Sequence, residues 1–313
     1  MTAERLRAYF PILTLVALVI LVGTFDTSFL RIENLMQLAS DVTTLFVMAL
    51  GITFVIYIGS IDLSAQSLAS MTTVIVSSAI PVIGAAAVPL ALLIGAGFGA
   101  VSGLIAVKTK IPTFIATLAT AGIAYSIAQY VSGQKGLSID VSLRESWLGW
   151  SFGNIGPVPK EIIVAGALLV VATIVERRTV AGRIFKAIGA GEAGAISSGI
   201  QVERFKIAAF AISGALAAMS GLMLAARLSG GSPTAADQFL LPAIVAVLVG
   251  GTPLTGGVGG VVNTMVGALI VAVTRASMVY LSIPAQGQQI FFGCVLIVAI
   301  ALTIDRRKVR TVK

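Results

Sequence analysis

The acidic residue best placed to do chemistry is Asp62, in the stretch YIGSIDLSAQS at 57–67. The neighbouring segments 42–58 and 68–107 contain no charged residue. An ionised carboxylate in so apolar a setting needs a partner. We expect it to cap a new helix after a break at Gly59-Ser60, accepting from the amide of Ser64 or Ala65. Contact with a polar ligand, or a place in an exposed turn, would also explain it.

Uncharged hydroxyls and amides are the other candidates for contact with a ligand, and they suit a neutral, hydroxyl-rich solute. The same groups also bond between helices or to their own backbone. We therefore expect most of them to hold helices together and a minority to face a pathway. The set is Ser64, Gln66, Ser67, Thr117, Thr120, Gln129, Asn263, Thr274 and Gln286.

The sequence lacks the residues that several kinds of functional site require. The sequence has no histidine, and its single cysteine, Cys294, lies in an apolar run. Zinc, haem and disulfide chemistry are therefore not expected. No G-x-x-x-x-G-K-[ST] loop occurs, so this chain has no nucleotide site of that type. We predict no catalytic residues, no metal site, no cofactor and no enzymatic activity of the chain itself.

The composition sets the fold that must position these residues. Hydrophobic residues make up 57% and charged residues 11%, and the mean hydropathy is +1.02. Several apolar runs reach the length of a membrane-spanning helix without strand-like alternation. We predict an all-α, polytopic membrane bundle, a single domain over 1–313, with broken helices near the pathway. About ten spans are expected, at 9–25, 42–60, 67–83, 86–107, 112–132, 161–176, 207–227, 240–251, 260–281 and 288–304.

Basic residues predict the orientation. Because cytoplasmic loops are enriched in lysine and arginine, an inward N-terminus is favoured: it puts most of the 21 basic residues inside. Both termini are then cytoplasmic. This distribution also accounts for the net charge of +8, so nucleic acid is not an expected partner. The basic residues left outside are Arg31, Lys135, Arg144, Lys160 and Arg227, while Arg275 lies within a span, where it could snorkel or pair with an acid.

Two extramembrane segments are expected. The outer one, 133–160, contains Trp147 and Trp150, which suit a membrane interface, and it forms either a lid on the bilayer or a docking surface. The inner one, 176–206, is rich in small residues that let a partner approach closely. It is either a plain basic loop or a contact for another subunit. We expect a short helix over about 192–198, ended by Gly199.

A further break is expected at 249–260, where Pro253 and several glycines interrupt an apolar run. This stretch echoes the one at Asp62: Gly59-Ser60-Ile61-Asp62-Leu63-Ser64 pairs with Gly250-Gly251-Thr252-Pro253-Leu254-Thr255. An internal duplication and chance similarity both explain the pairing.

Longer stretches resemble the ribose-type permeases, the membrane subunits of bacterial ATP-binding-cassette importers. TVAGRIFKAIGAGEAGAISSGIQVERFK at 179–206 is similar to their cytoplasmic coupling segment. GSIDLS at 59–64 is similar to their G-G-I-D-L-S signature, with Ser60 in place of the second glycine. IPTFIATLAT at 111–120, FAISGALAAMSGL at 210–222 and AIVAVLVGGTPLTGGVGG at 243–260 extend the resemblance from about residue 40 to the end.

The resemblance implies a permease subunit that moves a monosaccharide or related sugar or polyol across the bacterial inner membrane. It implies four kinds of partner besides membrane lipid: a cytoplasmic ABC ATPase, a second permease chain, a periplasmic sugar-binding protein and the sugar. An ion-coupled secondary transporter of a small polar solute is the alternative, with Asp62 as its intramembrane acid. The residues expected to contact the ATPase are Gly189, Gly191, Glu192, Ala193, Gly194, Ala195, Ser198 and Gly199.

Overall fold

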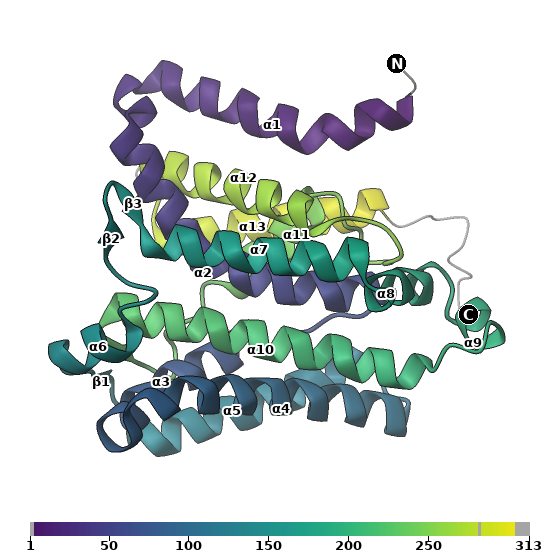
Figure 1. The fold of residues 1–313 in the computed structure, drawn as a ribbon. Coiled ribbons are helices and arrows are strands. Elements are labelled where there is room, and N and C mark those ends of the chain that lie inside the picture. The colour runs from purple at the N-terminus through teal and green to yellow at the C-terminus, as the bar shows by residue number, and fades with distance from the viewer. Residues whose placement is uncertain (1–2, 281–282, 304–313) are drawn as a thin grey trace.

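The computed structural model describes residues 3–280 and 283–303 as a bundle of helices lying side by side (Figure 1). The predicted all-α fold is confirmed. The long helices and α11 are α1 (Ala3–Phe25), α2 (Ile32–Tyr57), α3 (Ala65–Ile83), α4 (Ala87–Thr109), α5 (Thr113–Ser132), α7 (Lys160–Arg178), α10 (Val202–Leu228), α11 (Leu240–Val249), α12 (Val261–Tyr280) and α13 (Ala285–Thr303).

Short elements connect them. They are the 3-10 turns η1 (Thr27–Leu30) and η2 (Gly84–Ala86), the helices α6 (Val141–Leu148), α8 (Val180–Ala190) and α9 (Glu192–Ser197), and four two-residue strands. The strands pair antiparallel, β1 (Leu137–Ser138) with β4 (Gly230–Gly231) and β2 (Asn154–Ile155) with β3 (Val158–Pro159).

Each predicted span overlaps a helix, although the ends shift, most of all at α2, which begins at Ile32 and not at the predicted residue 42. In the described part of the chain, five helical stretches are long and apolar enough to cross a membrane: Ile32–Tyr57, Ala65–Thr109, Thr113–Ser132, Val202–Leu228 and Val261–Val279. Apolar segments at Pro11–Phe25 and Leu240–Val249 are shorter. Helix α7 is not among these stretches, because it carries charged residues at both ends.

The centre of the bundle is α2. Every residue from Val42 to Tyr57 is buried, and α2 packs against α10, α11, α12 and α7. Its apolar sequence suits either a protein core or lipid, and its burial and contacts place it in the core.

Close packing of α4 on α10 depends on glycines spaced four apart. A Cβ on Gly95 or Gly99 would overlap a backbone carbonyl oxygen of α10, and one on Gly103 would lie 3.0 Å from the Ile207 Cα. Gly214 returns the contact from α10. Small residues at this spacing allow two helix backbones to touch.

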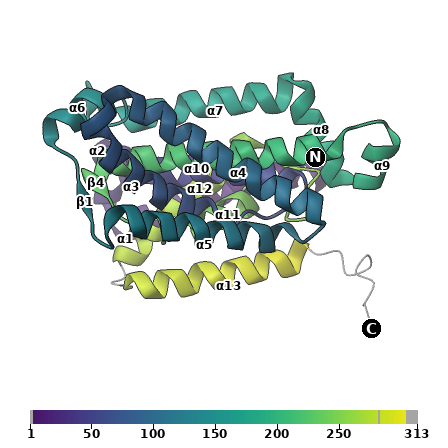
Figure 2. The ribbon, with the colours of Figure 1, turned by 90° about the horizontal axis from the view of Figure 1, so that it is seen from below.

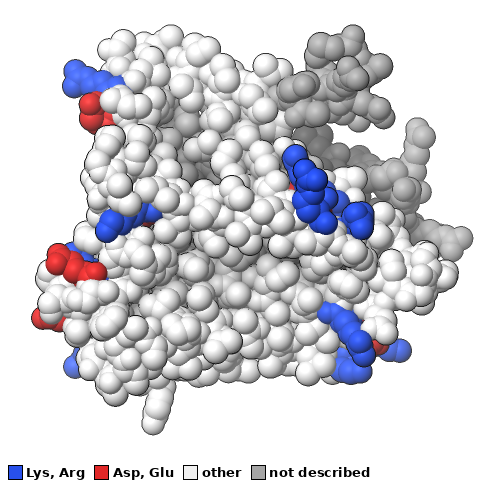
Figure 3. Space-filling view, viewed as in Figure 1, with Lys and Arg blue, Asp and Glu red and all other residues white. Residues whose placement is uncertain are grey.

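The two segments predicted to lie outside the membrane occupy opposite ends of the bundle. Residues 133–160, with α6 and the β2–β3 hairpin, form one end, whereas α8 and α9 form the other (Figures 1 and 2). The first turn of α1 lies at the α8–α9 end. In the face shown in Figure 3, charged side chains gather at the two ends and the middle is uncharged.

At the 133–160 end, the Ser142 hydroxyl and amide donate to Asp140 and hold the pKa of its carboxyl below the usual range.

The side of the membrane that each end faces stays a prediction, which cysteine labelling tests. Single cysteines at Gly191 and Lys135, both exposed, in a Cys294→Ala background are expected to react with an impermeant thiol reagent from opposite sides. The Gly191→Cys variant should react only after the membrane is permeabilised. Labelling of both cysteines in intact cells would contradict the predicted orientation.

Candidate functional site

The site begins at the break that follows α2. Gly59 has a φ of +69°, and the amides of Gly59 and Ser60 donate to the carbonyls of Ile56 and Val55. These are the two bonds of a Schellman motif, which needs a residue with positive φ and therefore favours glycine. The helix ends here because of local turn chemistry, and α3 restarts at Ala65.

The end of α11 repeats this geometry. Gly251 has a φ of +91°, and the amides of Gly251 and Thr252 donate to Leu248 and Val247. The backbone thus equates Gly59 with Gly251. The sequence pairing of Gly59 with Gly250 is wrong by one residue as a structural alignment. The predicted break at 249–260 is confirmed, because no helix or strand occupies 250–260.

Asp62 lies fully buried in the first break, with 0% of its surface exposed. Its Oδ1 accepts from the Ser64 amide at 2.8 Å and the Ser64 hydroxyl at 2.6 Å. Its Oδ2 accepts from the Ser213 hydroxyl of α10 at 2.7 Å. The predicted bond from the Ser64 amide is present, but Ser64 itself is the residue at the N-cap of α3. The carboxylate therefore fixes the turn before α3 and ties it to α10.

Two predicted pathway threonines have hydrogen-bond partners on other segments, and one of them holds the break in place. The Thr117 hydroxyl accepts from the Leu63 amide at 3.1 Å, and the Thr120 hydroxyl lies 2.7 Å from that of Ser102. Both are buried. Thr113 of α5 adds a 3.4 Å bond from the Ile61 amide. Thr113 and Thr117 therefore support the loop, whereas Thr120 joins α5 to α4.

Three other predicted pathway residues are differently placed. Gln66, Ser67 and Asn263 are half-buried, and in the described part of the chain their side chains make no hydrogen bond. The Gln129 amide donates to the Tyr125 hydroxyl at 2.6 Å, Thr274 bonds to its own helix at Ile270, and Gln286 is exposed.

The short helix expected in the inner segment is α9, which extends beyond the ends of the neighbouring helices (Figures 1 and 2). Gly199 follows it with a φ of +78°. Gly191, Glu192, Ala193, Gly194, Ser198 and Gly199 are all exposed, whereas Ala195 is buried. Glu192 pairs with Lys206 at 2.7 Å. The exposed large apolar side chain of α9 is that of Ile196, at 59%.

Gly189, at the last turn of α8, joins this segment to both breaks. A Cβ on Gly189 would overlap the Tyr57 carbonyl oxygen and the Gly257 amide nitrogen. The Gly257 amide donates to the Tyr57 carbonyl at 3.0 Å, and a Cβ on Gly256 would lie 2.6 Å from the Gly59 nitrogen. We call this meeting of 57–59, 189–190 and 256–257 the glycine junction.

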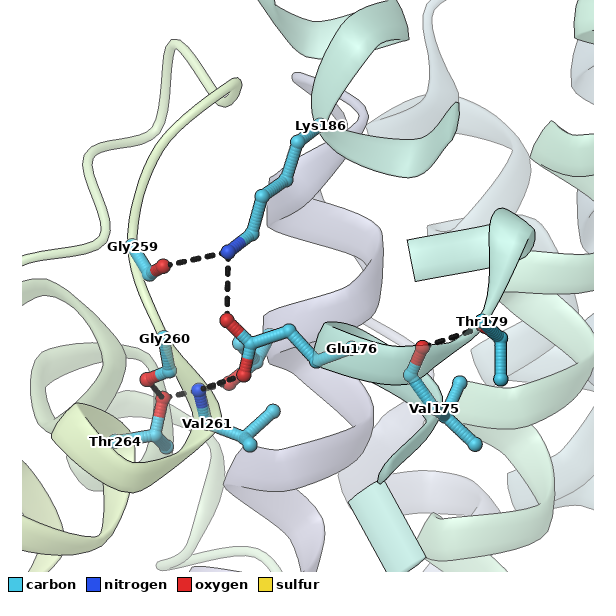
Figure 4. A network of polar contacts seen from close by, with 9 residues as sticks. Val175, Glu176, Thr179, Lys186, Gly259, Gly260, Val261 and Thr264 are labelled. Carbon is cyan, nitrogen blue, oxygen red and sulfur yellow. Dashed lines mark hydrogen bonds and ion pairs between the residues drawn. The ribbon is translucent and has the colours of Figure 1, made fainter. Parts of the chain in front are cut away.

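An ion pair lies beside the glycine junction (Figure 4). Lys186 of α8 donates to Glu176 Oε1 of α7 at 2.6 Å and to the Gly259 carbonyl at 2.9 Å. Glu176 Oε2 accepts from the Val261 amide, the first residue of α12, at 3.0 Å. Neither side chain was predicted from the sequence to belong to the site. An acid at the end of an apolar run with a lysine ten residues later was the available signal.

Known proteins similar to this chain agree on one family. Residues 34–300 match the family described as branched-chain amino acid transport system / permease component. The ribose import permease protein of Haemophilus influenzae is 35% identical over 92% of this chain and 90% of its own length, and that of Bacillus subtilis is 34% identical over 95% and 92%.

An autoinducer 2 import system permease protein of Yersinia enterocolitica is also similar, with 30% identity over 91% of this chain and 79% of its own length. No solved structure matches the chain. The matches cover both breaks, the glycine junction and α9. The chain therefore belongs to the branched-chain amino acid transport system / permease component family, as a ribose-type permease of the ATP-binding-cassette importers.

Proposed function

We propose that this chain is the transmembrane permease subunit of an importer that moves a monosaccharide or related sugar or polyol into the cytoplasm. A separate ABC ATPase drives it. The observation that carries the proposal is the glycine junction, which connects the exposed α9 to the breaks at 58–64 and 250–260 through backbone contacts. Relatives named as ribose import permeases support the sugar.

The partners follow from the two ends of the bundle. The ATPase binds the α9 end, at Gly191, Glu192, Ala193, Gly194, Ser198 and Gly199, while Gly189 and Ala195 anchor that surface. A periplasmic sugar-binding protein delivers substrate at the 133–160 end. A second permease chain completes the pathway within the bacterial inner membrane, and both termini face the cytoplasm.

Within the pathway, Gln66, Ser67 and Asn263 are the proposed sugar contacts. Their uncommitted amide and hydroxyl groups suit a neutral polyol, and each lies near a helix break. Asp62, Ser64 and Thr117 act one step back by fixing the loop before α3, while Thr120 ties α5 to Ser102 of α4. An ion-coupled carrier is less well supported, because the carboxylate of Asp62 is fully committed to three donors.

Reconstituted uptake tests the function. The chain would be placed in proteoliposomes with its genomically neighbouring ATPase and binding protein, with ribose as the first radiolabelled probe. Uptake is expected to require internal ATP, to cease with an ATPase variant that cannot hydrolyse it, and to be insensitive to ionophores. Uptake that ignores ATP and collapses with an ionophore would establish the ion-coupled alternative.

Substitution on α9 tests where the ATPase binds. Ile196→Asp is expected to reduce co-purification of the ATPase about tenfold, because it places a charge where an exposed apolar side chain would be buried. The matched control is Ile155→Asp in β2. That residue is 61% exposed, close to the 59% of Ile196, but lies at the other end. Equal retention of the ATPase by both variants would place its contact elsewhere.

A further inference from the structure

The Glu176–Lys186 pair connects three segments. Two of them, α7 and α8, are consecutive helices, and the third, 259–261, comes much later in the chain. Glu176 lies in the last turn of α7, Lys186 in α8, and their backbone partners Gly259 and Val261 at the end of the second break. The Glu176 side chain is 3% exposed and that of Lys186 is 30% exposed. The pair is therefore shielded enough for its charges to interact strongly.

Each charge has a second partner on the same stretch of backbone. The carboxylate of Glu176 faces the first amide of α12, where the positive end of the helix dipole favours an anion. Lys186 binds the Gly259 carbonyl two residues earlier. Together the pair binds both ends of 259–261 from the same side, as Figure 4 shows. The start of α12 is thus positioned by side chains of α7 and α8.

The same helix, α8, also contacts the first break. Gly189 lies against the Tyr57 carbonyl, and the Lys186 ammonium lies 5.0 Å from the centre of the Tyr57 ring. Because α8 is a single helix of 11 residues that leads directly through Gly191 into α9, a displacement of α9 reaches both breaks through one short element.

We propose that Lys186 is a positioning residue that makes 259–261, and with it the start of α12, follow α8 when the ATPase moves α9. Glu176 is its fixed partner on α7. This inference rests on the proposed function. It assigns to this pair the link between α8 and the second break. A partner can shift a conformational equilibrium only through contacts that differ between states. Losing Lys186 removes a side-chain link to 259–261 but leaves the glycine junction.

The test compares sugar moved per ATP hydrolysed in the reconstituted complex. Lys186→Met keeps much of the aliphatic stem and removes the ammonium. It is expected to assemble with the ATPase and hydrolyse ATP, while sugar transported per ATP falls about fivefold or more, within the usual range of a coupling free energy. Lys186→Arg, which retains the charge, should keep most of the coupling.

Changes at Glu176 separate the ion pair from the contact with α12. Glu176→Gln retains an oxygen that accepts from Val261 but loses the charge, so coupling should fall while the complex stays assembled. In Glu176→Lys/Lys186→Glu the pair is restored in reverse, but lysine has no acceptor for the Val261 amide. This exchange is expected not to restore coupling.

Three results would overturn the inference. The first is an unchanged ratio of sugar transported to ATP hydrolysed in Lys186→Met, and the second is full recovery of that ratio in the charge exchange. The third is failure of both Lys186→Met and Glu176→Gln to insert and assemble, which would assign the pair to folding. Failure of the proposed function is separate, since it would appear as ATP-independent uptake by the unsubstituted complex.

Discussion

Gly189→Ala is expected to reduce transport tenfold or more, even though it adds a single methyl group. The new Cβ would overlap the Tyr57 carbonyl oxygen and the Gly257 amide nitrogen, and both are backbone atoms. No flexible side chain can move aside, so the methyl must push α8 away from both breaks. Overpacking of this kind costs about 1–3 kcal/mol. A cost of about 1.4 kcal/mol lowers the equilibrium population of the close-packed arrangement of α8 tenfold.

Gly166→Ala provides the matched control, in the interior of α7. A Cβ on Gly166 meets nothing within 4 Å, and alanine is favoured over glycine inside a helix. Uptake and ATPase binding should therefore be close to those of the unsubstituted complex. If Gly189→Ala matched this control in uptake and thermal stability, the close approach at the glycine junction would have no importance for transport.

Local sequence signals predicted the breaks and the inner helix correctly. Gly59 and Gly199 both occupy positive-φ positions after a helix, and each lies where the sequence places the end of a helix. The amide of Ser64 donates to Asp62 as expected. These features depend on residues only a few positions apart, so turn and capping chemistry are sufficient to predict them.

Contacts between distant segments were not predictable in the same way. Nothing near Ser213 in the sequence indicates that its hydroxyl bonds to Asp62, 151 residues away. Likewise, Gly189 looks like one small residue among many in 187–200, although its place against Tyr57 sets it apart from the exposed Gly191 and Gly194. Such contacts arise from how α8, α10 and the breaks pack, which one chain's periodicity does not specify.

The internal pairing of the two breaks shows the same limit. Sequence similarity aligned Gly59 with Gly250, whereas the Schellman bonds equate it with Gly251. Both registers match glycines and small residues, so composition could not choose between them. The hydrogen-bond pattern can, because only the residue with positive φ fulfils the same role in both turns.

Asp62→Asn is expected to retain most transport, whereas Asp62→Ala should lose transport and stability together. In the asparagine variant, Oδ1 still accepts from the Ser64 amide and hydroxyl, and the new amide nitrogen can donate to Ser213 if that hydroxyl turns to accept. Alanine leaves two hydroxyls and an amide without their acceptor in a fully buried site. Each unsatisfied group costs about 1–3 kcal/mol, which is a large part of the stability of a single domain.

Uptake, folded yield and thermal stability of these variants, measured beside Ser213→Ala, separate support of the break from direct contact with the sugar. Ser213→Ala removes the tie to α10 while keeping the Asp62–Ser64 turn, so its loss of stability should be smaller than that of Asp62→Ala. A carboxylate that binds sugar or gates the pathway through its charge would give a different pattern. Asp62→Asn would then assemble, melt normally and hydrolyse ATP, yet move no sugar, and the role of Asp62 as a support for the loop would have to be abandoned.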